Sequence, residues 1–123
     1  MKFFLILASV VIIFFFIKKD KGNSISIEEF HSLFQQNSKL NIIDVRTTGE
    51  YNGPLGHING AKSIPLSNIQ ESIKNFNSDG NMIYYVICQS GGRSARATRI
   101  MIDNGINAIN ILGGMTAWTR LKK

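Results

Sequence analysis

The sequence predicts an α/β protein with three layers, in which a mainly parallel β-sheet is flanked by helices and preceded by one N-terminal hydrophobic helix. Short apolar runs rich in β-branched and aromatic residues alternate with segments whose apolar residues recur at helical spacing. Strands separated by helices pair in parallel, and a parallel sheet is covered on both faces. The hydrophobic helix is predicted from a separate apolar run that opens the chain.

Length and composition limit the chain to one soluble domain of ordinary globular type. Its 123 residues are one domain at about 100–200 residues per domain. A hydrophobic share of 44% and a charged share of 18% exclude long disorder and a coiled-coil rod. The single cysteine, Cys88, excludes a disulfide scaffold. His31 and His57 have no metal-ligand spacing, so no metal site is expected.

The positive charge of the chain is divided between its two parts. The formal net charge is +6, and residues 1–21 carry half of it. The remainder, residues 22–123, has no block of lysine and arginine with interleaved aromatic residues. The high isoelectric point therefore gives no reason to expect a nucleic-acid partner.

Residues 1–21 are predicted to be a transmembrane or signal-anchor segment, and residues 22–123 the folded domain. Residues 3–17 read FFLILASVVIIFFFI, with lysine on both sides of the run. As a helix they would extend about 22 Å, against about 30 Å of hydrocarbon core. Flanking lysines that snorkel to the headgroups, together with local thinning of the bilayer, can cover this difference.

Two other interpretations of this run stay open. A cleaved signal peptide has an apolar region of similar length but ends in small residues, which are lacking before Lys18 and Lys19. A buried core helix would show an amphipathic pattern, which is also lacking. Lys18, Lys19 and Lys21 follow the run, so the positive-inside bias favours a cytoplasmic domain, with the exported or periplasmic face as the alternative.

The first half of the domain is predicted to contain two helices and two strands. After a polar link at residues 22–24, the elements are a helix over 26–37, a strand over 40–45, a glycine- and proline-rich loop over 49–60, a short strand over 61–64 and a helix over 67–76. Ser26 with Glu29 has the spacing of a capping box, and Ser67 with Gln70 repeats it.

The second half is predicted to contain two strands and two helices. The elements are a fully buried strand over 82–88, a loop over 89–92, a helix over 93–104, a strand over 107–112 and a last helix after Gly113 and Gly114. Gly105 lies where a helix usually ends. Ligands of such sheets bind beyond the carboxyl ends of the strands, and Cys88 lies at one of these ends.

Cys88 has the setting of an activated nucleophile, because it ends a buried strand and precedes a glycine-containing loop and a helix. Three features are expected to lower its pKa: loop N–H groups, the positive end of the following helix and the charge of Arg93. Gly91 and Gly92 allow the positive φ angles that a curled loop needs. Arg96 and Arg99 follow on the same helix, either as a positive approach for an anion or as solvated charges.

Several motifs in the expected order resemble the rhodanese family. Residues 88–94, CQSGGRS, resemble its active-site loop, Cys-x-x-Gly-x-Arg-Ser. Other matching stretches are Asp44-Val45-Arg46 with Glu50-Tyr51, Gly56 to Ala61 with Ile64-Pro65-Leu66, and Gly113-Gly114 with Trp118. The likeness covers residues 25–121. In two departures, Asn59 replaces the usual proline, and Gly53-Pro54 lengthens the preceding loop.

The resemblance implies a rhodanese-like fold and a sulfurtransferase that needs no metal or organic cofactor. Cys88 would be the catalytic nucleophile and would accept sulfane sulfur from thiosulfate or a polysulfide as a persulfide. A thiol or cyanide would then remove that sulfur. Arg93 would bind the sulfonate group of thiosulfate. The substrate-binding residues that the resemblance implies are the other residues of the loop: Gln89, Ser90, Gly91, Gly92, Arg93 and Ser94.

Two other functions remain alternatives at this point. One is a membrane-tethered sulfur carrier or interaction module, which would bind an unidentified protein partner and would not catalyse turnover. A phosphatase or arsenate reductase of the same fold has five residues between cysteine and arginine, whereas four separate Cys88 from Arg93. The physiological donor and acceptor, the membrane orientation and the oligomeric state are not predicted.

Residues of the outer motifs are expected to have structural roles. Asp44 should accept hydrogen bonds from nearby loop amides, and Arg46 and Glu50 should pair and brace their loop. His57 is expected to be a turn residue, and Trp118 to pack either in the core or at the edge of the domain.

Overall fold

The central sheet has five strands, all parallel, in the order β1-β5-β4-β2-β3. The structure is a computed structural model that describes residues 23–121. The strands are β1 (Ser24–Ile25), β2 (Asn41–Asp44), β3 (Lys62–Ser63), β4 (Tyr84–Ile87) and β5 (Ala108–Ile111). Strand β4 lies in the middle, paired with β2 on one side and β5 on the other. The predicted parallel sheet is confirmed, and the loop that follows its central strand is the one containing Cys88.

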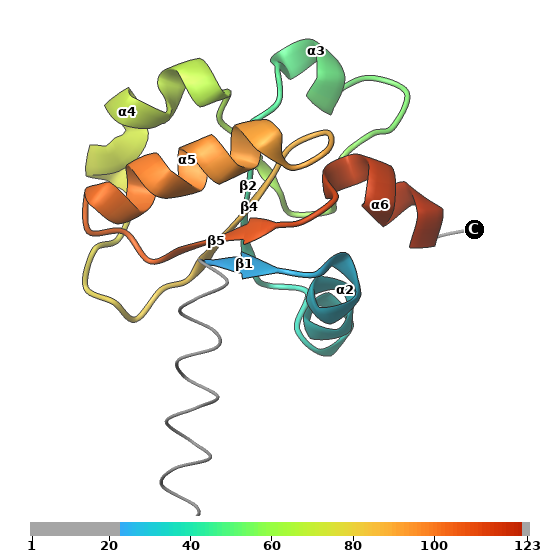
Figure 1. The fold of residues 1–123 in the computed structure, drawn as a ribbon, viewed down its shortest axis with the longest axis horizontal. Coiled ribbons are helices and arrows are strands. Elements are labelled where there is room, and N and C mark those ends of the chain that lie inside the picture. The colour runs from blue at the N-terminus through green and yellow to red at the C-terminus, as the bar shows by residue number, and fades with distance from the viewer. Residues whose placement is uncertain (1–22, 122–123) are drawn as a thin grey trace, which may run out of the picture.

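Helices cover both faces of this sheet and complete the three predicted layers (Figure 1). One face carries α2 (Ile27–Gln36) and α6 (Gly114–Leu121), and the other carries α4 (Ile69–Ser72) and α5 (Gly92–Asp103). The 3₁₀ turns η1 (Leu66–Asn68) and η2 (Ile73–Asn75) flank α4, and α3 (Thr48–Tyr51) follows β2. The helix α5 begins directly after the Cys88 loop and therefore presents its N-terminus to it.

Alternation along β4 places the cysteine on the α5 side of the sheet. Tyr85 and Ile87 belong to the core beneath α2 and α6, whereas Val86 and Cys88 belong to the core beneath α4 and α5. Successive side chains of a strand point to opposite faces, so Cys88 continues the row that contains Val86. Its side chain therefore faces the helix that begins four residues later.

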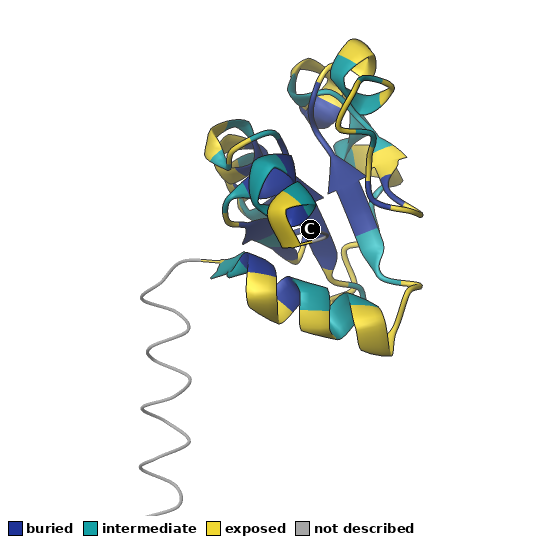
Figure 2. Cartoon of the chain, turned by 90° about the vertical axis from the view of Figure 1, so that its right-hand side faces the viewer, coloured by how far each residue is buried: buried dark blue, intermediate teal, exposed yellow. Residues whose placement is uncertain are grey.

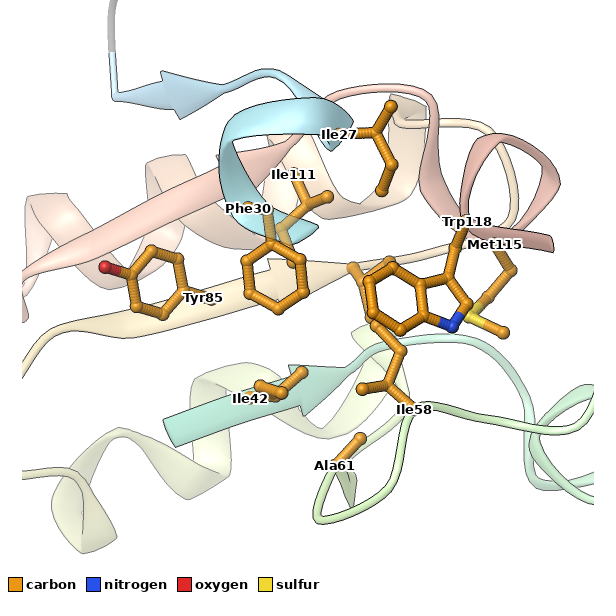
Figure 3. Packing of buried hydrophobic residues seen from close by; sticks show 10 residues of the cluster. Ile27, Phe30, Ile42, Ile58, Ala61, Tyr85, Ile111, Met115 and Trp118 are labelled. Atoms are coloured by element: carbon orange, nitrogen blue, oxygen red, sulfur yellow. The ribbon is translucent and has the colours of Figure 1, made fainter. Parts of the chain in front are cut away.

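An aromatic cluster fills the core beneath α2 and α6. Figure 3 shows the rings of Phe30 and Trp118 next to each other above the strands, with Tyr85 on the far side of Phe30. The Phe30 centroid lies 5.8 Å from that of Trp118 and 5.5 Å from that of Tyr85. Tilted aromatic pairs at such distances are favourable beyond the area that they bury. The core role predicted for Trp118 is confirmed.

The helix α2 shows how the amphipathic pattern is used. In Figure 2 buried and exposed residues alternate along it, and the three inner strands, β2, β4 and β5, are mostly buried. The side chain of Ser26 accepts a hydrogen bond from the Glu29 backbone N–H, which caps the helix as predicted. On the other face of the sheet, α5 buries Ala97 and Met101 and ends before Gly105, which has a φ of +81°.

Three local predictions are wrong. The polar link at residues 22–24 contains part of β1, whose Ser24 pairs with Asn110 at the edge of the sheet. The predicted single helix over 67–76 is divided into η1, α4 and η2, and no cap hydrogen bond from Ser67 forms. A full capping box forms instead between Thr47 and Glu50, where it starts α3 inside the expected loop.

The predicted N-terminal hydrophobic helix, and with it the membrane segment over residues 1–21, lies outside the described residues. Within residues 23–121 no helix combines the length and the apolar character needed to cross a bilayer.

Candidate functional site

The Cys88 sulfur lies at the centre of a small hydrogen-bonded loop. The residue is only 1% exposed, and its Sγ atom accepts a hydrogen bond from the Gly91 backbone N–H at 3.0 Å. The Ser94 hydroxyl lies 3.2 Å from the same sulfur. Both contacts come from the segment that leads into α5, so the turn from strand to helix holds the sulfur between a backbone donor and a hydroxyl group.

This environment lowers the pKa of the Cys88 thiol below its ordinary value. Burial taken alone raises the pKa, and it is the largest single contribution. Hydrogen bonds from the Ser94 hydroxyl and from the backbone N–H groups of Ser94, Gly91 and Ser90 outweigh it together. The site therefore favours the thiolate, which is the nucleophilic form of cysteine. The N–H groups of the loop thus lower the pKa of Cys88 as expected. The guanidinium group of Arg93 pairs with Glu50 rather than with the sulfur.

One glycine and two side chains hold the loop in its curled shape. Gly91 has a φ of +121°, outside the range that L side chains readily adopt. Gly92 has no positive φ and simply begins α5, so only one of the two expected glycines is required for its conformation. The Gly91 carbonyl accepts a hydrogen bond from the Asn110 side-chain amide at 3.4 Å. The Ser94 hydroxyl oxygen lies 3.1 Å from the same carbonyl, and its single proton can be donated either there or to the Cys88 sulfur.

The N-terminus of α6 supports the loop from behind. The backbone N–H of Met115 donates to the Cys88 carbonyl at 2.8 Å, and that of Thr116 donates to the Gln89 carbonyl at 3.0 Å. Gly114 lies so close to this backbone that an added Cβ would meet the Cys88 carbonyl oxygen at 2.5 Å. Gly114 also has a φ of +56°. Gly114, the first residue of α6, thus lets this helix approach the Cys88 loop.

Arg93 makes a two-point ion pair with Glu50. Its terminal nitrogens lie 2.6 and 2.8 Å from the two carboxylate oxygens. Hydrogen bonding to Arg93, the largest cause, lowers the pKa of Glu50 to about 2, and the same contact raises the pKa of Arg93. The expected pairing of Arg46 with Glu50 therefore does not use the Glu50 carboxylate, and Arg46 contacts the Glu50 backbone carbonyl instead. The sequence predicted Arg93 as a site residue but did not predict its ion pair with Glu50.

Arg46 pairs instead with Asp44, in a buried contact at the end of β2. The Nη2 atom of Arg46 lies 2.7 Å from an Asp44 carboxylate oxygen. Asp44 also accepts a hydrogen bond from the Arg46 backbone N–H, as predicted. The guanidinium further donates to the carbonyls of Glu50 and Gly56, so it ties together the chain that follows β2.

A shallow depression of about 410 Å³ lies beside the loop, lined by Arg46, Glu50, Pro54, Leu55 and Gln89. Gln89 is therefore placed at its wall, whereas the Ser90 side chain is exposed. The lengthened segment with Pro54 forms part of the border, as its position in the sequence suggested. Within residues 23–121 no three His, Cys, Asp or Glu side chains are grouped so as to hold a metal ion.

The remaining residues considered from the sequence lie outside the loop. The His57 ring stacks on Tyr51 at 3.7 Å, and its Nδ1 atom lies 2.9 Å from the Tyr51 carbonyl, which fits a turn residue. Arg96 and Arg99 are exposed on α5. Sequence reasoning missed Asn110 and the support from α6. A polar residue within the apolar strand β5 was the available signal for Asn110.

Comparison with known proteins agrees with this geometry. A profile of the rhodanese-like domain family matches residues 26–121, which is nearly all of the folded part. The chain belongs to the rhodanese-like domain family, whose homologues are sulfurtransferases and sulfur carriers. The matched residues include Cys88 and the loop that follows the central strand.

Two curated relatives and one solved structure are similar to this chain. The putative sulfur carrier protein YrkF of Bacillus subtilis is 38% identical over 96 residues, which are 77% of this chain and half of that protein. The chloroplastic thiosulfate sulfurtransferase 16 of Arabidopsis thaliana is 31% identical, over 80% of this chain and 88% of that protein. A rhodanese-like domain protein from Staphylococcus aureus superimposes with a TM-score of 0.70 at 38% identity, over 78% of this chain and 90% of that one.

Proposed function

We propose that the protein transfers sulfane sulfur from a small donor to a thiol acceptor through a persulfide on Cys88. The observation that carries this proposal is the Cys88 sulfur held between the Gly91 N–H and the Ser94 hydroxyl, with its pKa lowered. Thiosulfate and polysulfides are the candidate donors. The names of two relatives, a thiosulfate sulfurtransferase and a putative sulfur carrier, are consistent with this chemistry.

In the first half-reaction the Cys88 thiolate attacks the outer sulfur of the donor. With thiosulfate, a new S–S bond forms to Cys88 while the donor S–S bond breaks, and sulfite leaves with the bonding electron pair. The total charge is the same on both sides, and no external oxidant is needed. The N–H groups of Ser90, Gly91 and Ser94 can stabilise the terminal sulfur of the persulfide as preorganised donors.

In the second half-reaction a thiolate or cyanide attacks the terminal sulfur of the persulfide. The S–S bond to Cys88 breaks and the Cys88 thiolate is regenerated, again without net oxidation. The hydrogen bonds that lower the pKa of Cys88 also make it a better leaving group in this step. A sulfur carrier would use the same residue but would discharge it only to a partner protein.

A phosphatase or arsenate reductase is the less favoured alternative. Such chemistry needs a cation free to bind a tetrahedral oxyanion in the loop. Arg93 is instead paired with Glu50 at both terminal nitrogens, and the loop is one residue shorter than that pattern requires.

We also propose that residues 1–21 anchor the domain to a membrane, with the domain on the cytoplasmic side. Support for this comes from the sequence alone, through the apolar run over 3–17 and its flanking lysines. Carbonate extraction of cell membranes should leave the full chain in the pellet and should release a variant that lacks residues 1–21. Extraction of both forms would contradict anchoring.

Turnover by the full chain tests the proposed activity. Thiosulfate and cyanide should yield thiocyanate with the wild type and none with Cys88→Ser, while a phosphate ester stays intact. Phosphate release without sulfur transfer would replace the proposal by the phosphatase alternative. If neither thiocyanate nor phosphate forms, and sulfur is transferred only to the thiol of a partner protein, the result would favour the sulfur-carrier alternative.

A further inference from the structure

The positive charges near the Cys88 loop are neutralised by carboxylates, whereas a site that binds an anion needs a cation that is free to contact it. Two guanidinium groups, those of Arg46 and Arg93, lie near the Cys88 loop, and each is paired with a carboxylate. Arg46 is fully committed, because both it and Asp44 are buried. Arg93 is 36% exposed and so is accessible to solvent, and Glu50 occupies both of its terminal nitrogens.

Glu50 is fixed in this position by its own helix. Glu50 is the third residue of α3 and forms its capping box with Thr47. The Glu50 carboxylate accepts hydrogen bonds from the Thr47 backbone N–H at 3.2 Å and from the Thr47 hydroxyl at 3.1 Å. The carboxylate is therefore held both by α3 and by Arg93. A donor that uses Arg93 must separate the pair, and Glu50 then stays nearby as an uncompensated negative charge.

The walls of the depression add little positive charge. Besides Arg46 and Glu50, they consist of the apolar residues Pro54 and Leu55 and the neutral Gln89. The thiosulfate dianion therefore meets a fixed carboxylate and a neutralised guanidinium. A persulfide with a neutral organic body brings less charge to the same position, and its body can contact the apolar side.

We propose that Glu50 is a specificity-determining residue that, by neutralising Arg93 at the mouth of the site, favours sulfur donors of low charge such as alkyl persulfides over thiosulfate. The inference rests on the proposed function, because it concerns the donor of the same sulfur-transfer reaction. The favoured step is the attack of the Cys88 thiolate on the outer sulfur of R–S–SH. The S–S bond of the donor breaks, a new one forms to Cys88, the thiolate R–S⁻ leaves, and the proton stays on the transferred sulfur.

The test compares two donors on two matched variants of the full chain. Glu50→Gln removes the charge and keeps an oxygen that can accept from Thr47. Glu28→Gln makes the same change of charge on the exposed side of α2, on the opposite face of the sheet from α5. The rate of persulfide formation on Cys88 is measured by rapid-quench mass spectrometry with thiosulfate and with 2-hydroxyethyl persulfide.

We expect Glu50→Gln to raise the second-order rate with thiosulfate by about tenfold, because a unit charge a few ångströms from a dianion is removed from a partly hydrated site. The rate with 2-hydroxyethyl persulfide should change by less than about threefold, and Glu28→Gln should change neither rate. The double variant Glu50→Gln, Arg93→Gln should lose the gain with thiosulfate. Equal changes with both donors, or a slower reaction with thiosulfate in Glu50→Gln, would overturn the proposal.

A second measurement separates this inference from the proposed function. Alkylation of Cys88 by anionic iodoacetate and by neutral iodoacetamide reports the same electrostatics without any sulfur transfer. Glu50→Gln should raise the ratio of the iodoacetate rate to the iodoacetamide rate, and Glu28→Gln should leave it unchanged. If neither sulfur donor labels Cys88, the proposed function fails, while this ratio still decides the role of Glu50. An unchanged ratio would refute that role whatever the activity.

Discussion

Two arginine–carboxylate pairs lie near the carboxyl ends of β2 and β4, and they differ in burial far more than in distance. Asp44 and Arg46, at the end of β2, are 0% and 1% exposed, with 2.7 Å between the closest atoms. Glu50 and Arg93, at the mouth of the Cys88 loop, are 33% and 36% exposed, with 2.6 Å between the closest atoms. Water competes for the second pair and not for the first. Equal distances therefore carry unequal energies.

The difference assigns the pairs to different tasks. The buried pair holds the backbone at Glu50 and Gly56 and cannot separate without leaving a charge inside the protein. The exposed pair can separate at modest cost, and its Glu50 lines the depression beside the Cys88 loop. A buried structural pair and an exposed pair that can separate thus lie next to each other, at the carboxyl ends of the inner strands β2 and β4.

Removal of the buried arginine should have the largest effect. Arg46→Ala leaves the Asp44 carboxylate buried without its partner, so we expect the free energy of unfolding to fall by about 3–5 kcal/mol. Urea denaturation followed by circular dichroism measures this loss. A loss below 1 kcal/mol, comparable to that of an exposed pair, would erase the distinction between the two pairs.

Crowding behind the reactive loop should have the next largest effect. Gly114→Ala places a Cβ against the Cys88 and Gln89 backbone at a positive φ, so we expect a loss of about 1–3 kcal/mol. Gly92→Ala is the matched control, because an added Cβ there meets no atom within 4 Å and φ is not positive. Equal stabilities of the two variants in denaturant titrations would show that α6 does not brace the loop.

The reactivity of Cys88 should depend on pH in a way that identifies its hydrogen bonds. Because the pKa is lowered, the alkylation rate of the wild type should reach its midpoint below the pH of an ordinary thiol. Ser94→Ala removes the hydrogen bond that lowers the pKa of Cys88 most and should move the midpoint upward. Ser90→Ala keeps the backbone N–H and should leave the midpoint in place. A midpoint that moves equally in both variants would argue against a specific role for the Ser94 hydroxyl.

The exposed pair should have the smallest effect on stability. Glu50→Gln should cost less than about 1 kcal/mol at neutral pH. Since folding lowers the pKa of Glu50 from 4.5 to about 2, its contribution is present above pH 4.5 and is lost as the pH falls toward 2. The difference between wild type and variant in denaturant titrations should therefore shrink between these two values. A difference that grows at low pH would reverse the sign assigned to this pair.

Patterns within one element predicted most of the fold. The run over 82–88 was predicted to be a buried strand because it is rich in β-branched and aromatic residues, and the strand spans Tyr84–Ile87, with Cys88 directly after it. The cap at Ser26 and the end of α5 at Gly105 are set by residues within a few positions of one another. Such signals are local, so they can be found without knowledge of the tertiary structure.

Contacts between distant segments were the part that could not be predicted. Glu50 and Arg93 are 43 positions apart, and only the pairing of β2 with β4 brings their loops together. Asp44 pairs with Arg46 because the two residues lie two positions apart at the buried end of β2. The Glu50 carboxylate is therefore available to pair with Arg93. The two-residue strand β1 forms only because β5 offers an edge, and nothing in its own sequence marks it.

The most direct test of the account is the intact mass of the full chain after exposure to a sulfane-sulfur donor. We predict that the wild type gains the mass of one sulfur atom with thiosulfate or with 2-hydroxyethyl persulfide. Cyanide should remove it with release of thiocyanate, and Cys88→Ser should gain nothing. A folded wild type with a free thiol that gains no sulfur from either donor would contradict the central claim. A gain that survives in Cys88→Ser would do the same.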